Sequence, residues 1–372
     1  MTTLMKRARI AVVGAGGIGA AAHLPAVTAL SDEAELVAIV DLDPARLADA
    51  VETFGPTRGY ADLGEMLAAE RPDITVIATP PHLHEPLSIQ AMEAGSWVFC
   101  EKPLTGSLAS ADRIREAEQR TGQWCVTVSQ FRYSGGSRQV RDALAAGTWG
   151  RPLLGVAHTS WYRGPDYWEA AWRGKFRTEF AGATTSQAHH AIDLLLWLMD
   201  SPWEQVAAYA DTLSRPIEVE DASVASVRFR SGALATMLST VLSHNQETRL
   251  QVMAEDATVD LHTLYMPLLD EWSVRRTDAD GTRVVEDWAE PEEPVQAHRA
   301  QLANILAHWR DGRQPELTCA EARETLEFLT ALYKSSAVGA PVTRGEIAAG
   351  DPFYEALDAA GPARAEAKHA LR

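Results

Sequence analysis

The feature that most constrains this chain is a glycine-rich turn between an apolar run and a helical pattern near the N-terminus. The apolar run of residues 10–13 leads directly into Gly14-Ala15-Gly16-Gly17-Ile18-Gly19. A G-x-G-x-x-G turn after a strand is typical of dinucleotide-binding units, in which the first glycine allows the tight turn, the second admits a pyrophosphate, and the third lets the helix pack closely. The pyrophosphate then lies at the N–H groups that begin the helix. We therefore predict that a dinucleotide is contacted by Gly14, Gly16, Gly17, Ile18 and Gly19.

The end of the next apolar run indicates which dinucleotide binds. Residues 35–40 lead into Asp41, at about the spacing of ~20 residues expected for a ribose-binding carboxylate. Asp41 can accept hydrogen bonds from both hydroxyls of an adenosine ribose, and its charge repels a 2′-phosphate. NAD is therefore the predicted cofactor. Arg46, one turn into the next helix, could soften this preference, which leaves NADP as the less favoured alternative.

The first third of the chain alternates between apolar runs and helical patterns. Such alternation predicts a parallel, doubly wound sheet, whose ligands lie beyond the carboxyl ends of the strands. Thr79 and Pro80 follow one predicted strand, and Glu101 and Lys102 follow the next, so all four are expected to face the cofactor. We predict a Rossmann domain over residues 1–128. Its expected strands include 74–78, 97–100 and 124–128, and its expected helices include 44–54, 62–69, 84–94 and 107–121.

Past about residue 150 the pattern changes to longer, β-rich alternating runs. Consecutive strands favour antiparallel pairing, and one face of such a sheet can stay exposed for subunit contact. We predict that residues 129–372 form an α+β domain on a large open mixed, mostly antiparallel sheet, which binds substrate and joins subunits into a homodimer or homotetramer. The expected strands are 153–162, 205–212, 223–230, 233–241 and 248–254, and the expected helices are 297–309 and 320–336.

Composition excludes several classes of partner. The formal net charge of -17 disfavours binding to nucleic acid or to acidic lipid, because both would meet a field of like sign. No run approaches the ~20 apolar residues that span a bilayer. Cys100, Cys125 and Cys319 are odd in number and lack a C-x-x-C pair, which indicates reduced, buried thiols. These features predict a cytoplasmic protein.

Three motifs together resemble the Gfo/Idh/MocA oxidoreductases, relatives of glucose-fructose oxidoreductase and inositol dehydrogenase. They are the glycine turn, Glu101-Lys102-Pro103 after the fifth strand, and the segment 182–193. The resemblance implies a dinucleotide domain followed by a mixed open-sheet domain, with NAD(P)-dependent chemistry at secondary alcohols of sugars or cyclitols. It also implies that Lys102 is the active-site lysine, that His190 is the catalytic histidine, and that His84 braces the loop near the cofactor.

The implied roles agree with the chemistry of alcohol oxidation. A base must take the hydroxyl proton while hydride leaves carbon for the nicotinamide, and histidine titrates near neutral pH. The ammonium of Lys102 can hydrogen-bond the substrate oxygen and stabilise developing alkoxide charge. His189, beside His190, is expected to be structural. Because the histidines and cysteines lack the spacing of a metal site, we predict a metal-free reaction.

The chain departs from the family pattern at Ser186, where many members carry Asp one helical turn before the histidine. Here a neutral hydroxyl is followed by Gln187. Without the carboxylate, His190 would be a weaker base, or Lys102 would carry more of the proton chemistry. Asp193 either braces the histidine ring or caps a separate network. We expect Lys102, Ser186, Gln187 and His190 to contact the substrate.

An aromatic segment, residues 161–174, offers further substrate contacts. Its tryptophans and tyrosines, interleaved with charges, suit a ring that is apolar on its faces and hydroxylated at its rim. The same aromatic residues could instead pack a domain or subunit boundary. We predict Arg163 and Arg173 as polar contacts to the substrate. Trp172 and Arg173 also resemble an element near the nicotinamide in some relatives, which implies contact with the cofactor.

Together these features predict an enzyme, an NAD-dependent dehydrogenase that moves a hydride between a secondary hydroxyl of a sugar, glycoside or cyclitol and the nicotinamide. Two alternatives stay open. One is an NAD-dependent glycosidase that oxidises the sugar transiently to allow elimination. The other is a catalytically silent NAD-binding regulator, against which the intact Lys102 and His190 argue and which the missing carboxylate at Ser186 keeps open.

Overall fold

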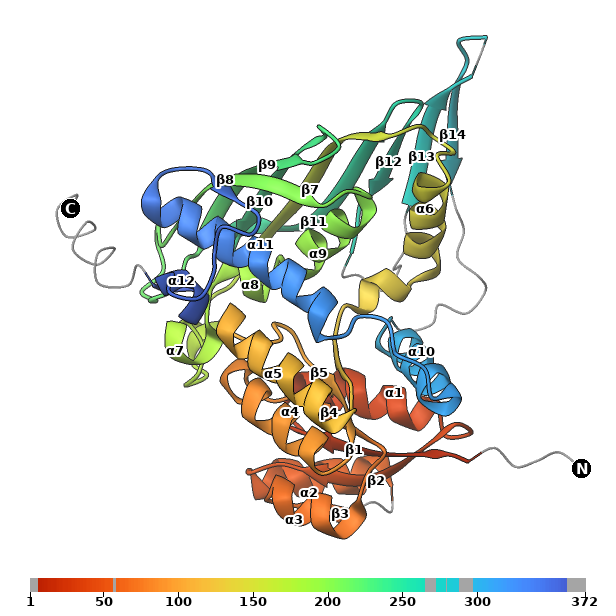
Figure 1. Cartoon of the computed structure of the whole chain (residues 1–372), viewed down its shortest axis with the longest axis vertical. Helices are drawn as coiled ribbons and strands as arrows, with labels where there is room; N and C mark the ends of the chain where they lie inside the picture. The colour runs from red at the N-terminus through yellow and green to blue at the C-terminus, as the bar shows by residue number, and fades with distance from the viewer. Residues whose placement is uncertain (1–5, 56–57, 265–271, 279, 288–296, 360–372) are drawn as a thin grey trace, which may run out of the picture. The chain divides into compact units, whose positions relative to one another are not determined.

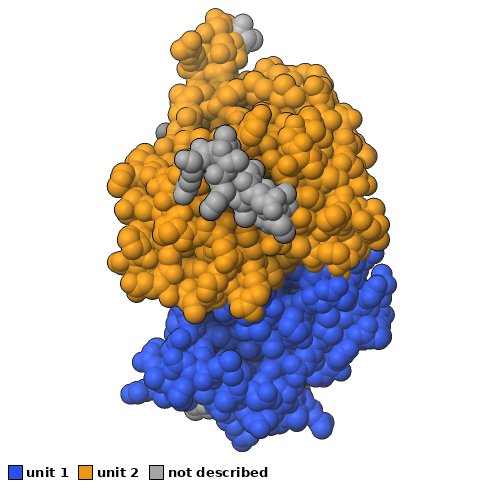
Figure 2. Space-filling model, turned by 90° about the vertical axis from the view of Figure 1, so that its left-hand side faces the viewer, with its two compact units in different colours: residues 1–105, 110–130, 295–323 blue, residues 106–109, 131–294, 324–372 orange. Residues whose placement is uncertain are grey.

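The chain folds into two compact units, which Figure 2 shows in blue and orange. The computed structural model describes residues 6–55, 58–264, 272–278, 280–287 and 297–359. The first unit comprises residues 1–105, 110–130 and 295–323, and the second comprises 106–109, 131–294 and 324–372. The sequence-based boundary kept all of 129–372 together, whereas residues 295–323 belong to the first unit. None of the described helices is long and apolar enough to cross a membrane.

A six-stranded parallel sheet forms the centre of the first unit (Figure 1). Its strand order is β3-β2-β1-β4-β5-β6, and the central strands β4 and β5 are buried along their whole length, as expected for a sheet covered on both faces. The strands are β1 (Ala8–Val13), β2 (Ala34–Val40), β3 (Arg58–Tyr60), β4 (Ile74–Ile77), β5 (Trp97–Cys100) and β6 (Cys125–Thr127). The helices are α1 (Leu24–Ala29), α2 (Pro44–Phe54), α3 (Leu63–Glu70), α4 (His84–Glu93), α5 (Leu108–Thr121) and α10 (Ala297–Asp311).

Local sequence explains where several of these helices begin. Asp43 precedes Pro44 and accepts hydrogen bonds from the N–H groups of Ala45 and Arg46, which caps α2. Asp62 caps α3 in the same way by accepting from Glu65 N at 2.8 Å. Both caps satisfy N–H groups that a helix cannot pair internally. The predicted helices of the first third are thereby confirmed.

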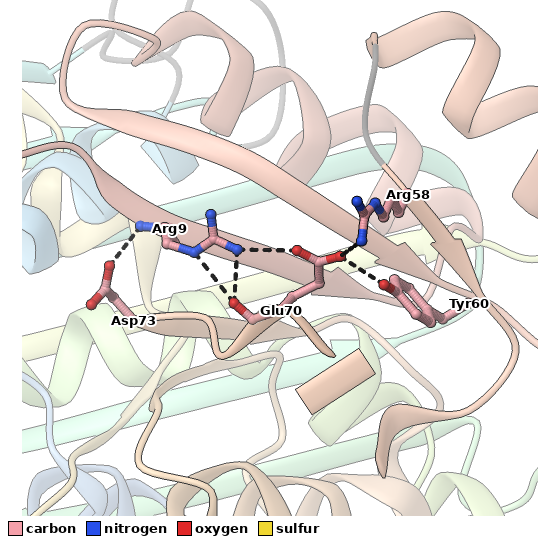
Figure 3. A network of polar contacts seen from close by, with 5 residues as sticks. All are labelled: Arg9, Arg58, Tyr60, Glu70 and Asp73. Atoms are coloured by element: carbon pink, nitrogen blue, oxygen red, sulfur yellow. Dashed lines mark hydrogen bonds and ion pairs between the residues drawn. The ribbon is translucent and has the colours of Figure 1, made fainter. Parts of the chain in front are cut away.

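A polar network fastens the amino end of β1 to α3 and β3 (Figure 3). Glu70 accepts from Arg9 Nη2 at 3.0 Å, from Tyr60 Oη at 2.6 Å and from Arg58 Nη1 at 3.3 Å. The backbone N–H of Arg9 also donates to Asp73 Oδ2 at 2.8 Å. The hydrogen bond from Tyr60, aided by the two guanidinium groups, holds the pKa of Glu70 below its usual value. These contacts lie at the end of β1 away from the glycine turn.

A nine-stranded mixed sheet forms the second unit, with the order β14-β13-β12-β11-β7-β10-β9-β8-β15. Among the described strands, β7 and β10 are parallel and the other neighbours are antiparallel, which confirms the predicted mixed sheet. The strands are β7 (Pro152–Tyr162), β8 (Trp203–Asp211), β9 (Ala222–Phe229), β10 (Leu234–Thr240), β11 (Leu242–Ala254), β12 (Ala257–Leu261), β13 (Trp272–Thr277), β14 (Arg283–Asp287) and β15 (Val342–Thr343).

One face of this sheet is buried and the other is exposed. Residues alternate between buried and exposed along β8 and β9, the pattern of a sheet with one solvated face. Helices α8 and α9 pack against β7, β9, β10 and β11. The helices are α6 (Gly135–Ala145), α7 (Phe176–Glu179), α8 (Ala183–Ser186), α9 (His189–Leu198), α12 (Pro352–Glu355) and α11 (Cys319–Val338), which begins in the first unit and continues in the second.

The three cysteines are buried and form no disulfide, as predicted. Cys100 ends β5 and Cys125 begins β6, so both thiols lie in the first sheet. Burial raises the pKa values of both thiols and of Cys319. Thiols of this kind are poor nucleophiles, and they carry no part of the site described below.

Candidate active site

The predicted cofactor residues of the first unit follow four neighbouring strands. Asp41 follows β2, Gly14 follows β1, Thr79 lies two residues after the end of β4, and Glu101 follows β5. The strands are parallel and hydrogen-bonded in this order, so their carboxyl ends meet at one edge of the sheet. A ligand of a doubly wound sheet binds at this edge.

The glycine turn has the geometry that its sequence predicts. Gly14 has a φ of +101°, and a Cβ there would lie 2.5 Å from Ala78 O. A Cβ on Gly19 would lie 2.0 Å from Gly14 O, so the chain that follows packs against the turn. By contrast, a Cβ on Gly17 would meet nothing within 4 Å. Gly14 and Gly19 are therefore required by packing, whereas Gly16 and Gly17 leave open space in which a ligand can approach the backbone.

The carboxylate of Asp41 is held by backbone N–H groups. Its Oδ2 accepts from Ala15 N at 2.7 Å, and its Oδ1 accepts from Asp43 N at 2.8 Å. Each oxygen retains a further lone pair for a ribose hydroxyl. Arg46 forms an ion pair with Asp43 at 3.1 Å, so its charge is partly compensated beside the predicted ribose site.

His84 braces two loops at this edge. Its ring is fully buried, and its Nε2 lies 2.9 Å from Thr79 O while its Nδ1 lies 2.8 Å from Pro103 O. Burial lowers the pKa of His84 although the two carbonyl groups favour the charged form. The bracing role that the resemblance implies thus matches its contacts, and any influence on the cofactor acts through the loops. Thr79 also carries a buried hydroxyl without a hydrogen-bond partner among the described residues.

Glu101 turns its carboxylate toward two histidines. Its Oε1 lies 2.9 Å from His23 Nε2 and 3.6 Å from His298 Nε2, and its Oε2 accepts from Lys102 N at 3.1 Å. Burial would raise the pKa of Glu101, but the hydrogen bond from His23 and the nearby ring of His298 outweigh it and hold the pKa well below the usual value. Glu101 therefore fixes the backbone of Lys102, the residue with the predicted catalytic ammonium.

The same three side chains could hold a metal ion. One ligand atom from each of His23, Glu101 and His298 lies within 4.8 Å of the others. Direct hydrogen bonding between His23 and Glu101 already pairs these two groups. A metal-free reaction therefore stays a prediction. The histidines escaped the sequence analysis because they lie far from Glu101 along the chain and in no ligand spacing.

In the second unit, His190 lies in the first turn of α9. Its side chain is buried, and its ring meets the ring of Phe131 edge-on at 5.2 Å between centroids. His189 is buried as well, with its ring perpendicular to that of His190 at 5.7 Å. Gln187 lies three residues before His190, in the turn that joins α8 to α9. The role of His190 in proton transfer stays a prediction.

Asp193 caps a separate network, the second of the two roles left open. It accepts from Arg132 Nε at 2.8 Å, from Arg132 Nη2 at 2.6 Å and from Thr325 Oγ1 at 2.8 Å. Burial would raise the pKa of Asp193, but Arg132 holds it below its usual value. This bidentate pair anchors α9 to α11 and to the segment before α6, and thereby fixes the helix that carries His190.

A carboxylate does lie beside Ser186, although the sequence shows none at that position. Ser186 Oγ donates to Glu179 Oε1 at 2.7 Å, and Glu179 is almost completely buried. Glu179 also accepts from Gly174 N at 2.6 Å and from Arg173 Nη1 at 3.0 Å. Glu179 was not predicted, because no motif links positions 179 and 186. Both come together because a turn separates α7 from α8.

Arg173 is the centre of a larger cluster that includes Tyr167 and Gln187. Its guanidinium lies over the ring of Tyr167 at 3.9 Å and over that of Trp172 at 4.2 Å, and Arg173 Nη1 donates to Tyr167 Oη. Gln187 Nε2 donates to the same oxygen at 2.6 Å. Arg163 lies over Trp161 at 4.4 Å and over Tyr167 at 5.0 Å. The structure thus brings predicted substrate residues from the aromatic segment and from the segment before α9 into one cluster.

Comparisons with known proteins cover nearly the whole chain. Residues 8–129 match an oxidoreductase family with an NAD-binding Rossmann fold, and residues 137–260 match the GFO/IDH/MocA C-terminal domain. The D-apiose dehydrogenase of Paraburkholderia graminis is 28% identical over 360 residues, which cover 92% of this chain and 91% of that protein. An inositol 2-dehydrogenase of Rubrobacter xylanophilus is 27% identical, over 76% of this chain and 78% of that protein.

A solved structure is also similar. The WlbA dehydrogenase of Bordetella pertussis, in complex with NADH and UDP-GlcNAcA, superimposes with a TM-score of 0.78 at 32% identity, over 91% of this chain and 99% of that one. The NAD-binding match and this NADH complex confirm NAD as the predicted cofactor. The individual contact residues remain predictions.

Proposed function

This chain belongs to the Gfo/Idh/MocA family of NAD-binding oxidoreductases, and from that premise we propose that it oxidises a secondary hydroxyl of a sugar, glycoside or cyclitol with NAD. The observation that carries the proposal is the combination of a complete glycine turn with Lys102 after β5 and His190 in a buried first helical turn. The names of the relatives, which act on apiose and inositol or bind a nucleotide sugar, support a carbohydrate-like substrate.

The first unit fits NAD at the carboxyl edge of its sheet. The backbone of Gly16 and Gly17 leaves room for a pyrophosphate, the Asp41 carboxylate is preoriented for ribose hydroxyls, and the buried Thr79 hydroxyl has a bond left to make. When bound, NAD supplies the acceptor for the hydride. Every other part of the reaction falls to side chains of this chain.

Lys102 and His190 divide those parts in our proposal. His190 takes the hydroxyl proton, since an imidazole can act as a general base near neutral pH. The Lys102 ammonium donates to the oxygen of the same hydroxyl and stabilises the negative charge that develops on it. The Glu101 carboxylate, through its bond to Lys102 N, keeps this backbone in place. Arg163, Arg173, Ser186 and Gln187 are proposed to hold the rest of the substrate, and Trp172 to lie near the cofactor.

The decisive experiment incubates the purified protein with NAD and a panel of cyclitols, aldoses, aryl glycosides and nucleotide-linked sugars, and follows NADH absorbance. We expect NADH to accumulate in step with one class of substrate. Release of aglycone without net NADH would instead identify the glycosidase. NAD binding without turnover on any class would favour the regulator and overturn our proposal.

We also propose that the exposed face of the nine-stranded sheet joins copies of the chain into a homodimer or homotetramer. Tyr209 is 77% exposed there and Val224 48% exposed, and a shallow hollow is lined in part by Leu154, Leu234 and Met253. Large exposed apolar patches usually mark contact surfaces. Sedimentation of the protein, with Val224→Lys as the variant, tests this: we expect an oligomer that the added charge dissociates.

A further inference from the structure

We infer that Tyr167 is a hydrogen-bond donor to a sugar oxygen of the substrate, because its own hydroxyl accepts from Arg173 and Gln187 and has only its proton left to give. This inference rests on the proposed function, since it names a contact within the same substrate site. Tyr167 belongs to the 3-10 turn Pro165–Trp168, and its side chain is half-buried.

The phenol of Tyr167 accepts two hydrogen bonds and keeps one proton to donate. A tyrosine oxygen can accept through its lone pairs and donate one proton. Arg173 Nη1 and Gln187 Nε2 both donate to it, and neither nitrogen can accept in these contacts. The proton must therefore point to a third partner. Among the described residues, no acceptor for that proton is found, so the phenol presents an unused donor.

The phenol is also held in one orientation by its neighbours. Arg173 stacks on the Tyr167 ring at 3.9 Å while its Nη1 reaches the phenol oxygen, and Glu179 holds the same guanidinium at 3.0 Å. Trp168 meets the Tyr167 ring edge-on at 4.9 Å. The ring and its oxygen are thus fixed from several sides before any ligand binds. A preoriented donor loses little freedom on binding.

Tyr167 is linked through Gln187 to the turn that precedes the helix of His190. Gln187, which donates to Tyr167, lies in the turn between α8 and α9, three residues before His190 in the chain. Burial raises the pKa of Tyr167, so the phenol keeps its proton at neutral pH. A neutral donor suits an oxygen that stays a hydroxyl or a ring ether. We assign Tyr167 to such a sugar oxygen, not to the one that is oxidised.

The test combines a change in the enzyme with a change in the substrate, as in a double-mutant cycle. The best substrate of the panel is prepared as a series of deoxy derivatives, and each is assayed with the wild type and with Tyr167→Phe. At one position, removal of the oxygen should lower kcat/KM roughly three- to tenfold with the wild type, the range of one hydrogen bond, and should have no further effect with Tyr167→Phe. An O-methyl group at that oxygen keeps the acceptor, so it should preserve the coupling.

Two further variants serve as controls for the role of the Tyr167 proton. Tyr209→Phe, on the exposed face of the sheet, removes a phenol outside the cluster and should leave every ratio unchanged. Gln187→Glu replaces an amide that donates with a carboxylate that only accepts. It should capture the Tyr167 proton and abolish the coupling as Tyr167→Phe does. For each deoxy derivative, the fold loss in kcat/KM relative to the parent substrate is compared between the wild type and Tyr167→Phe. If the two proteins show the same fold loss at every position, the inference is wrong.

Failure of the proposed function can be told apart from failure of this contact. The same derivatives are titrated by calorimetry onto the NADH-loaded protein, in which no oxidation takes place. Coupling in binding without turnover on any substrate would uphold the Tyr167 contact and reject the dehydrogenase. Turnover without coupling, in kinetics and in binding, would reject the contact alone. Absence of both would overturn both proposals.

Discussion

Two carboxylates among the candidate residues, Asp41 in the first unit and Glu179 in the second, are held in different ways. Asp41 accepts from the backbone N–H groups of Ala15 and Asp43, so its orientation follows from the path of the main chain. Glu179 accepts from one backbone N–H and from the side chains of Arg173 and Ser186. Its orientation therefore depends on which residues occupy two other positions.

This difference bears on how the surroundings of each carboxylate can change. A main-chain cradle survives most substitutions around it, because every residue but proline supplies an N–H group. A side-chain cluster is rebuilt by single substitutions, and its members depend on one another. The cofactor side is thus suited to one constant ligand. The side-chain cluster around Glu179, which we propose contacts the substrate, is suited to variation.

The largest expected effect separates the catalytic role proposed for His190 in the second unit from cofactor binding in the first. His190→Ala should lower kcat by roughly two to four orders of magnitude, because the proposed general base is lost. NAD affinity, measured by fluorescence titration, should change little, since His190 lies in the second unit. Lys102→Ala should reduce kcat at least as much through loss of alkoxide stabilisation. A His190→Ala variant with most of its activity intact would require another base.

Glu118, a second carboxyl of the first unit that accepts from a backbone N–H, should make stability depend on pH. Glu118 accepts from Cys125 N at 2.9 Å, yet burial raises its pKa to about 7. Because the folded pKa exceeds the unfolded value, the folded state binds the proton more tightly, and stability falls as pH rises from about 4.5 to about 7. The loss amounts to roughly 3 kcal/mol.

Glu118→Gln is the matched variant for that effect, since the amide oxygen can still accept from Cys125 N. Urea unfolding at a series of pH values should show the variant gaining on the wild type between pH 5 and 7.5. The gain should then level off. A constant difference between the two proteins across this range would mean that Glu118 does not titrate there.

The Asp41 cradle is tested by its ligand preference. Asp41→Ala should narrow or reverse the preference for NAD over NADP by roughly ten- to a hundredfold, because a charged hydrogen-bond acceptor and a phosphate-repelling charge are removed together. The measurement is the ratio of the two Kd values. Asp62→Ala removes a helix-capping carboxylate elsewhere in the first unit and should leave that ratio unchanged. Equal Kd values for NAD and NADP in the unmodified protein would contradict the role of Asp41.

The smallest effect concerns the side-chain cluster. Ser186→Asp restores the residue common in the family but sets a second carboxylate beside Glu179, which Ser186 Oγ contacts at 2.7 Å. Two adjacent carboxylates repel when both are charged, so the free energy of unfolding should fall by about 1–2 kcal/mol. Thermal unfolding measures the change.

A second substitution shows whether that loss comes from repulsion. Glu179→Gln removes the neighbouring charge, so adding it to Ser186→Asp should recover part of the lost stability. Ser186→Ala, which only deletes a hydroxyl, is the control and should give no such recovery when combined with Glu179→Gln. Equal behaviour of the two pairs would show that Ser186 and Glu179 do not couple through charge.

In the first unit, the predicted helix starts and the glycine turn agree with the structure, because capping residues and glycines decide the backbone there. Pro44 and Asp62 mark the starts of α2 and α3, and Gly14 and Gly19 have the contacts expected of them. The π-helix Gly19–His23 was not predicted, because its hydrogen-bond pattern has no distinctive residue spacing. Strands β3, β12, β13 and β14 were also missed, because runs this short show little periodicity. Asp280-Gly281, between β13 and β14, is a hairpin signal that could have found two of them.

The substrate side was predicted less completely for a physical reason. Motifs identified Arg173, Ser186 and Gln187, but their hydrogen bonds to Tyr167 and Glu179 join loops and single helical turns. Such contacts follow from tertiary packing and leave no periodic pattern. Position 186 itself carries no carboxylate. Glu179, seven residues earlier in the chain, places one beside it in space.

The position of β7 in the nine-stranded sheet has a consequence for how the chain folds. Leu154 of β7 pairs with Leu234 of β10 and with Met253 of β11, so both neighbours are made about 80 to 100 residues later. Contacts between such distant segments form slowly, since a long loop must close before they can form. During synthesis, both edges of β7 are therefore expected to stay unpaired until β10 and β11 have been made. Aggregation of the nascent chain should start from this strand, and its exposed interval ends only when β11 has emerged.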